Sequence, residues 1–337
     1  MQNMSETRVR RALRGEPLDR PPISFWAHNF ARENSAEELA AETVRVSRRY
    51  GWDFIKIQSR ASAFAEMWGS RYRPSTQIAV SPTLLDWPVH SQADLPTLRP
   101  VDPTSGALGE QLAALRAIRQ AVGPHVPILQ TVFAPTMVLT YLVNGPDNLR
   151  GYLAEAPAAM KAALAAIRET MAGYAQASLE HGADGIFFAI KAADGDLMTR
   201  DQYAEFGLPY DRPVLEAAGG GWLNLLHLCG DRLYFEVVDD LPSAFVSYAL
   251  SPHNPSLAAG RDRARRAMIG GVSPKPQIRE MTPTQVAAEV AAALADTGGV
   301  QMMIGPGCSI SPDTPEANLD AANEALAAWA AQPRSGQ

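Results

Sequence analysis

Two features of the sequence predict a single (β/α)8 TIM barrel, in the α/β class, spanning residues 1–337. Apolar runs alternate with segments of helical periodicity, and parallel strands require such helical crossovers. The runs are also apolar at nearly every position, as expected for strands that are buried on both faces. Eight such runs are present, at residues 23–26, 54–57, 126–132, 185–190, 222–228, 244–250, 267–272 and 302–304.

The intervening segments carry helical signals of two kinds. Apolar residues recur every three or four positions over 108–122 and 160–174, which is typical of amphipathic helices. Ser35 precedes Glu38 by three positions, the spacing of a capping box at a helix start. Three more side chains are predicted to cap helix starts, namely Thr199, Thr282 and Asp313.

An open, doubly wound sheet is the alternative architecture. It is disfavoured because no glycine-rich phosphate loop follows a predicted strand, and the GGG at 219–221 precedes one instead. A proline-rich stretch, 72–104, follows the second predicted strand. We interpret it as an insertion or lid within the one domain.

The composition excludes several classes of function. Of the 337 residues, 46% are hydrophobic and 20% charged, and the net charge is −6 with both signs interspersed. No cluster of basic residues indicates nucleic-acid binding, and no apolar stretch approaches the ~20 residues of a membrane span. The chain has two cysteines and no recognisable signal peptide, so we expect a cytoplasmic protein.

Both cysteines follow predicted strands. His227 and Cys229 end the fifth run, and Cys308 follows the eighth, 79 residues after Cys229. The carboxyl ends of barrel strands open on one face, so these side chains are expected to converge. Two thiolates and an imidazole suit zinc, and three protein ligands leave one position open, as in catalytic sites. The alternative is a buried histidine with two inert, packed cysteines.

Segments along most of the chain also carry a family resemblance. The chain resembles the uroporphyrinogen decarboxylase-like superfamily, and within it the zinc-dependent corrinoid and thiol methyltransferases. In that branch, His-x-Cys and a distant Cys bind zinc, which implies His227, Cys229 and Cys308 as metal ligands and catalytic residues here. The segments are RVRRALRGEPLDRPPISFW, DFIKIQSRASAFAEMWG, LMTRDQYAEFGLPYDRPVLEAA and MIGPGCSISPDTPEANLDAANEA.

The resemblance implies a zinc-bound thiol that exchanges a methyl group with a corrinoid. No Asp-x-His-x-x-Gly corrinoid motif is present, so methylcobalamin is expected on a partner protein. The substrate is expected to be a small thiol or a methylated small molecule. A homodimer is considered, although the sequence does not decide the oligomeric state.

Two departures from the family pattern matter. The arginine-rich segment that binds porphyrinogen carboxylates is reduced to Arg32 in PPISFWAHNFARENS. Methionine-forming relatives add a glutamate ligand at the sixth strand, where SAFVSYALSPHNP has no carboxylate. Water, Tyr248 or His253 is therefore expected as the fourth ligand. A decarboxylase acting on a smaller carboxylate is the alternative activity, and a non-catalytic barrel is the third hypothesis.

Further polar residues follow the predicted strands. Any of them could line a substrate pocket, and the simpler interpretation of each is a hydrogen-bonded residue at the barrel mouth. We predict a weak substrate-binding role for His28, Asn29, Gln58, Lys191, Tyr248 and His253.

Overall fold

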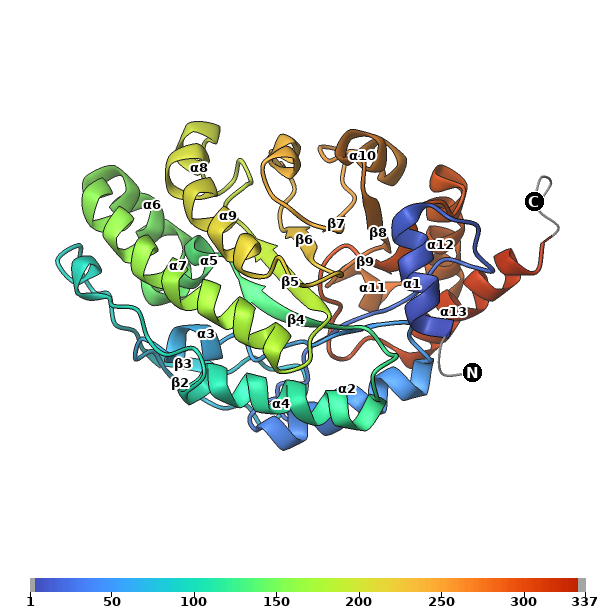
Figure 1. Cartoon of the computed structure of the whole chain (residues 1–337), viewed down its shortest axis with the longest axis horizontal. Coiled ribbons are helices and arrows are strands. Elements are labelled where there is room, and N and C mark those ends of the chain that lie inside the picture. Colours follow the sequence, from blue (N-terminus) through green and yellow to red (C-terminus); the bar gives the residue numbers. More distant parts are fainter. Residues whose placement is uncertain (1–3, 333–337) are drawn as a thin grey trace.

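The computed structural model describes residues 4–332 and has a curled parallel sheet with helices packed around it (Figure 1). The sheet has seven strands in the order β1-β4-β5-β6-β7-β8-β9, and each neighbouring pair is parallel. All of the predicted runs except the first contain one of these strands. Their bounds are Ile55–Lys56 (β1), Ile128–Phe133 (β4), Gly185–Ile190 (β5), Leu225–Leu228 (β6), Phe245–Tyr248 (β7), Ala267–Val272 (β8) and Met302–Pro306 (β9).

The first predicted run, 23–26, lies between the two edges of this sheet but is not a regular strand. On the β9 side, the backbone N–H of Ser24 donates to the Ile304 carbonyl at 3.1 Å. On the β1 side, the Asp53 N–H donates to the Ile23 carbonyl at 2.9 Å. Toward β9 the segment forms only isolated bridges, at Ile23 and Ala27, instead of a continuous ladder, so the prediction of eight ladder strands was wrong by one.

Helices connect the strands, as the alternation predicted. Ser35 accepts from the Glu38 N–H, and Thr199 and Thr282 form complete capping boxes. Asp313 is not a cap, because the last helix begins only at Glu316. The helices are Met4–Arg14 (α1), Ala36–Tyr50 (α2), Ala63–Glu66 (α3), Gly106–Val122 (α4), Pro135–Leu142 (α5), Pro146–Glu155 (α6), Pro157–Glu180 (α7), Arg200–Phe206 (α8), Leu208–Ala217 (α9), Leu257–Ala264 (α10), Gln277–Glu280 (α11), Pro283–Thr297 (α12) and Glu316–Ala330 (α13), with short 3-10 turns at Leu95–Thr97 (η1) and Phe235–Asp239 (η2).

A hairpin outside the main sheet occupies part of the proline-rich stretch 72–104. Its strands β2 (Arg71–Arg73) and β3 (Thr83–Asp86) pair antiparallel with each other and with no other strand of the described chain. Figure 1 shows the hairpin at the periphery of the molecule. That the stretch is an insertion or lid remains a prediction.

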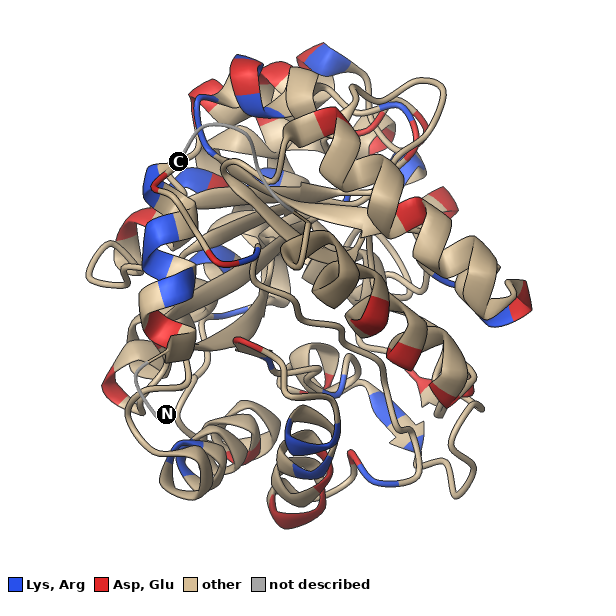
Figure 2. Cartoon of the chain, turned by 90° about the vertical axis from the view of Figure 1, so that its right-hand side faces the viewer, with Lys and Arg blue, Asp and Glu red and all other residues tan. Residues whose placement is uncertain are grey.

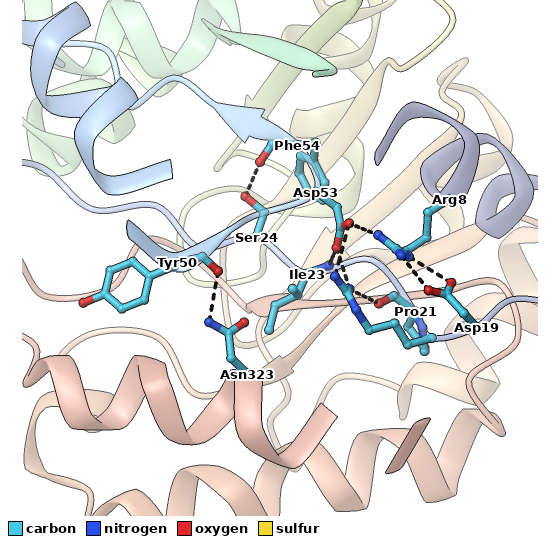
Figure 3. A network of polar contacts seen from close by, with 10 residues as sticks. Arg8, Asp19, Pro21, Ile23, Ser24, Tyr50, Asp53, Phe54 and Asn323 are labelled. Carbon is cyan, nitrogen blue, oxygen red and sulfur yellow. Dashed lines mark hydrogen bonds and ion pairs between the residues drawn. The ribbon is translucent and has the colours of Figure 1, made fainter. Parts of the chain in front are cut away.

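A buried ion-pair network fixes the run 23–26 at the start of the fold (Figure 3). The Asp53 carboxylate is 1% exposed and accepts from Arg8, from Arg20 at 2.6 Å and from the backbone N–H of Ile23 at 2.9 Å. Arg8 also pairs with Asp19, and this contact lowers the pKa of Asp19 to about 2. Side chains thus supply part of the bonding that a regular ladder would provide.

Acidic and basic residues are interspersed along the chain in the view of Figure 2. Within residues 4–332, none of the helices combines the length and apolar character that crossing a membrane requires.

Candidate functional site

His227, Cys229 and Cys308 converge where their strands end. His227 is on β6, Cys229 directly follows that strand, and Cys308 lies two residues after β9. Their ligand atoms all lie within 4.8 Å of one another. The fold therefore brings together the three residues that the sequence singled out, although β7 and β8 separate their strands in the sheet.

Close backbone packing positions the two cysteines. The Cys229 N–H donates to the Ile190 carbonyl at 2.8 Å, and the Gly307 N–H donates to the Val272 carbonyl at 3.0 Å. A Cβ on Gly307 would lie 2.5 Å from the Cα of Ala249. Residue 307 must therefore be glycine if Cys308 is to occupy this position.

The imidazole of His227 is fixed on one side and open on the other. Its Nδ1 lies 3.2 Å from the hydroxyl of Ser247 on β7, and its ring stacks on Phe187 with the centroids 4.9 Å apart. Its Nε2 is buried and has no hydrogen-bond partner among the described residues. A buried nitrogen of this kind costs free energy unless a ligand occupies it.

The two thiols shift each other's pKa in opposite directions. A hydrogen bond from Cys229 lowers the pKa of Cys308 well below its usual range, and His227 adds to this effect. The same bond, together with burial, raises the pKa of Cys229. In tetrahedral zinc sites with bonds of about 2.0–2.3 Å, ligand atoms lie about 3.5 Å apart. The ligand atoms of the cluster all lie within 4.8 Å of one another and are of the types that zinc prefers, so the three residues fit a zinc ion.

The cluster faces a cavity of about 460 Å³. Tyr72 and Leu84 of the hairpin contribute to its wall, as do apolar side chains from the sheet and from α5. Among the described lining residues there is no aspartate or glutamate. The polar lining includes His28, Lys56, Gln58, Thr131, Thr140, Tyr141, Asn144, Lys191, Lys275 and Ser309.

The weaker predicted site residues fall into three groups. His28, Gln58 and Lys191 line this cavity, whereas Asn29 lines a neighbouring cavity of about 210 Å³. Tyr248 and His253 line neither cavity.

The positions of Tyr248 and His253 do not suit a metal ligand. The Tyr248 hydroxyl donates to the Ser256 carbonyl at 2.9 Å, and His253 is exposed on the loop after β7. Adjacent strand residues point to opposite faces. Ser247 is paired in register with His227, so its neighbour Tyr248 points away from the cluster.

Sequence reasoning missed Lys56, Phe187 and Ser247. Lys56 precedes Gln58 by two positions, and residues two apart on a strand share a face. That spacing could have identified Lys56 once Gln58 was selected. No local signal marks Ser247 or Phe187, because their roles come from contacts with His227 on a neighbouring strand.

The sequence profile of the uroporphyrinogen decarboxylase (URO-D) family matches residues 4–329. The chain belongs to this family. The match covers nearly all of the described chain and includes His227, Cys229 and Cys308. This result confirms the predicted resemblance.

The relatives include two kinds of enzyme. The methylcobamide:CoM methyltransferase MtbA of Methanosarcina acetivorans is 25% identical over 331 residues, which cover 93% of this chain and 94% of that protein. The uroporphyrinogen decarboxylase of Magnetococcus marinus is 26% identical over 251 residues, covering 68% and 67%. The methyltransferase therefore aligns over a larger share of both chains.

Solved structures support the fold. A methyltransferase from Methanosarcina mazei superposes with a TM-score of 0.81 at 22% identity, over 97% of this chain and 99% of that one. A B12-independent methionine synthase from Shewanella gives a TM-score of 0.58 at 14% identity, over 92% and 97%. At these identities the likeness concerns the fold, and the barrel-type architecture predicted from the sequence is confirmed.

Proposed function

We propose that this protein is a zinc-dependent methyltransferase that moves a methyl group between a corrinoid on a partner protein and a small thiol. The observation that carries the proposal is the His227/Cys229/Cys308 cluster in a cavity, with the Nε2 of His227 buried and unpartnered. The alignment with MtbA over most of both chains supports it. Because the site needs reduced thiols, we place the protein in the cytoplasm.

In this proposal, His227, Cys229 and Cys308 hold the metal, and one coordination position stays open. Zinc held there would lower the pKa of a coordinated thiol, so that the substrate would be present as the nucleophilic thiolate. Ser247 and Phe187 hold the imidazole ring in place. Apolar side chains that include Phe133 and Phe187 form part of the cavity wall.

Metal analysis of purified variants tests the proposal. We expect about one zinc per chain, which Cys229→Ser should abolish together with methyl transfer from free methylcobalamin to the thiol of coenzyme M. His253→Ala is the matched control, because His253 lies outside the cavity and its loss should change neither result. Zinc bound equally by Cys229→Ser would contradict the ligand assignment.

Absorption spectroscopy at the zinc edge tests the open position. We expect two sulfur neighbours without substrate and three with a saturating thiol, and the thiol should release close to one proton near pH 7. An unchanged sulfur count with a thiol that reacts would leave zinc a structural role. Release of carbon dioxide from a carboxylate substrate, with no methyl transfer, would instead favour the decarboxylase alternative.

A further inference from the structure

The distribution of lysines in this chain is uneven. The sequence contains four, and three of them, Lys56, Lys191 and Lys275, line the cavity that holds the His/Cys/Cys cluster. The fourth, Lys161, is on the surface and pairs with Glu205 at 2.6 Å. Over residues 4–332, none of the three cavity lysines forms an ion pair. With no carboxylate in the described lining, the cavity is cationic.

Lys56 is the buried member of this set. It is 6% exposed, whereas Lys191 and Lys275 are exposed. Its ammonium donates to the side-chain oxygen of Gln58 at 2.5 Å, the one hydrogen bond it makes within the described chain. An ammonium has three donors, and burial lowers the pKa of Lys56 to about 7. Burial thus disfavours the charged form of Lys56, and two of its three ammonium donors have no described partner, which is unfavourable.

One aromatic ring contacts both Lys56 and the cluster. The Lys56 ammonium lies 4.5 Å from the centroid of the Phe187 ring, and that ring stacks on the imidazole of His227. The ammonium and the metal ligands line the same cavity. A small molecule whose sulfur is held at the cluster can present its other end to Lys56.

Neighbouring side chains fix the position of the ammonium. The Gln58 amide nitrogen donates to Nε2 of His28 at 2.8 Å, and Nδ1 of His28 lies 2.7 Å from the buried carboxylate of Glu33. Because the Gln58 amide nitrogen is engaged with His28, the Gln58 amide oxygen is the atom that accepts from the Lys56 ammonium. The ammonium is thus held in place before any ligand arrives.

We propose that Lys56 is a specificity-determining residue that binds an anionic group, a carboxylate or a sulfonate, at the far end of the thiol substrate. The inference rests on the proposed function for the position of the sulfur. A negatively charged group accepting from Lys56 would supply the missing charge and form a charge-assisted hydrogen bond. The exposed Lys191 and Lys275 add positive charge to the same cavity.

A comparison of thiols with matched size tests this assignment. Zinc-loaded protein is assayed with free methylcobalamin and with 3-mercaptopropionate, 2-mercaptoethanesulfonate or the uncharged 2-mercaptoethanol. We expect kcat/KM to be at least about tenfold higher for an anionic thiol. Lys56→Met should lower kcat/KM for the anionic thiols by about 10–100-fold and change it for 2-mercaptoethanol by less than about threefold. Lys161→Met is the matched control.

Equal losses with all three thiols, which a merely structural role would produce, would overturn the proposal. So would the absence of a charge preference in the unaltered protein. Lys56→Gln provides a second variant if Lys56→Met fails to fold. The better of the two anionic thiols distinguishes a carboxylate from a sulfonate.

A second measurement separates this proposal from the proposed function. Propionate and ethanesulfonate carry the anionic group without a thiol, so their binding requires neither zinc nor methyl transfer. Saturation-transfer NMR should detect at least one of them bound to the unaltered protein and not to Lys56→Met. If neither anion binds, the Lys56 site is refuted even when methyl transfer is observed.

Discussion

The two most polar buried regions of this molecule differ in whether their groups are satisfied. In the network around Asp53, two arginines and a backbone N–H surround one carboxylate (Figure 3). In the cavity, the Nε2 of His227 has no described partner and the Lys56 ammonium has a single one. Burying polar groups is costly in both places, and in the first the chain itself supplies the compensation.

The difference indicates which region serves the fold and which serves a ligand. Asp53 binds the irregular segment at residue 23 to the chain just before β1, so its bonds hold the sheet edges together. The Nε2 of His227 and the Lys56 ammonium in the cavity have no such role. Both can still form bonds to a molecule that is not part of the chain. The comparison predicts separable consequences of mutation in the two regions.

The largest effect is expected at Asp53. Asp53→Asn leaves the guanidinium groups of Arg8 and Arg20 without their shared carboxylate, and breaking a buried pair in this way costs about 3–5 kcal/mol. Urea unfolding should show the loss, while zinc content per chain stays unchanged. Glu16→Gln, which removes an exposed partner of Arg14, should leave stability nearly unchanged. If Asp53→Asn lost zinc without losing stability, Asp53 would serve the metal site and not the fold.

Asp211 on α9 offers a stricter test, because it is buried and partly unpartnered yet lines neither cavity described above. The Tyr203 hydroxyl donates to its Oδ2 at 2.9 Å, while Oδ1 has no described partner. Burial raises the pKa of Asp211 to about 7, above the value near 3.9 of an unfolded chain. Its contribution to stability is therefore fully present below about pH 4 and is lost as the pH rises through about 7.

Asp211→Asn should consequently gain stability relative to the unaltered protein between pH 4 and pH 8, by on the order of 2–4 kcal/mol. Unfolding curves at the two pH values measure this change. Tyr203→Phe keeps the carboxyl group and should keep the pH dependence. Reduced zinc content in Asp211→Asn would show that an unsatisfied buried group outside the cavity also serves the site.

The smallest effect is expected at Ser247. Ser247→Ala removes the contact that orients the imidazole of His227, and losing such a partner weakens metal binding by roughly tenfold. Competition with a chelating dye measures the affinity. Ser243→Ala, at a position that contacts Arg266, is the control. Equal affinities in the two variants would mean that stacking on Phe187 alone fixes the ring.

Much of the fold was visible in the sequence, for physical reasons that act locally. Strands buried on both faces are mostly apolar, so seven of the eight predicted runs overlap a strand of the sheet. The run at 23–26 was misjudged because its apolar residues are typical of a strand, while its bonding comes from Asp53 and isolated bridges. Those contacts join residues that are far apart in the sequence.

The sequence by itself determined the chemistry available to this protein. It has only two cysteines, and their positions after apolar runs, with His227 nearby, were enough to predict the cluster. The register between strands decided the rest. It placed Ser247 rather than Tyr248 beside His227, and Phe187 in contact with both His227 and Lys56. A shift of one residue reverses which face a side chain points to, and only the tertiary structure sets that shift.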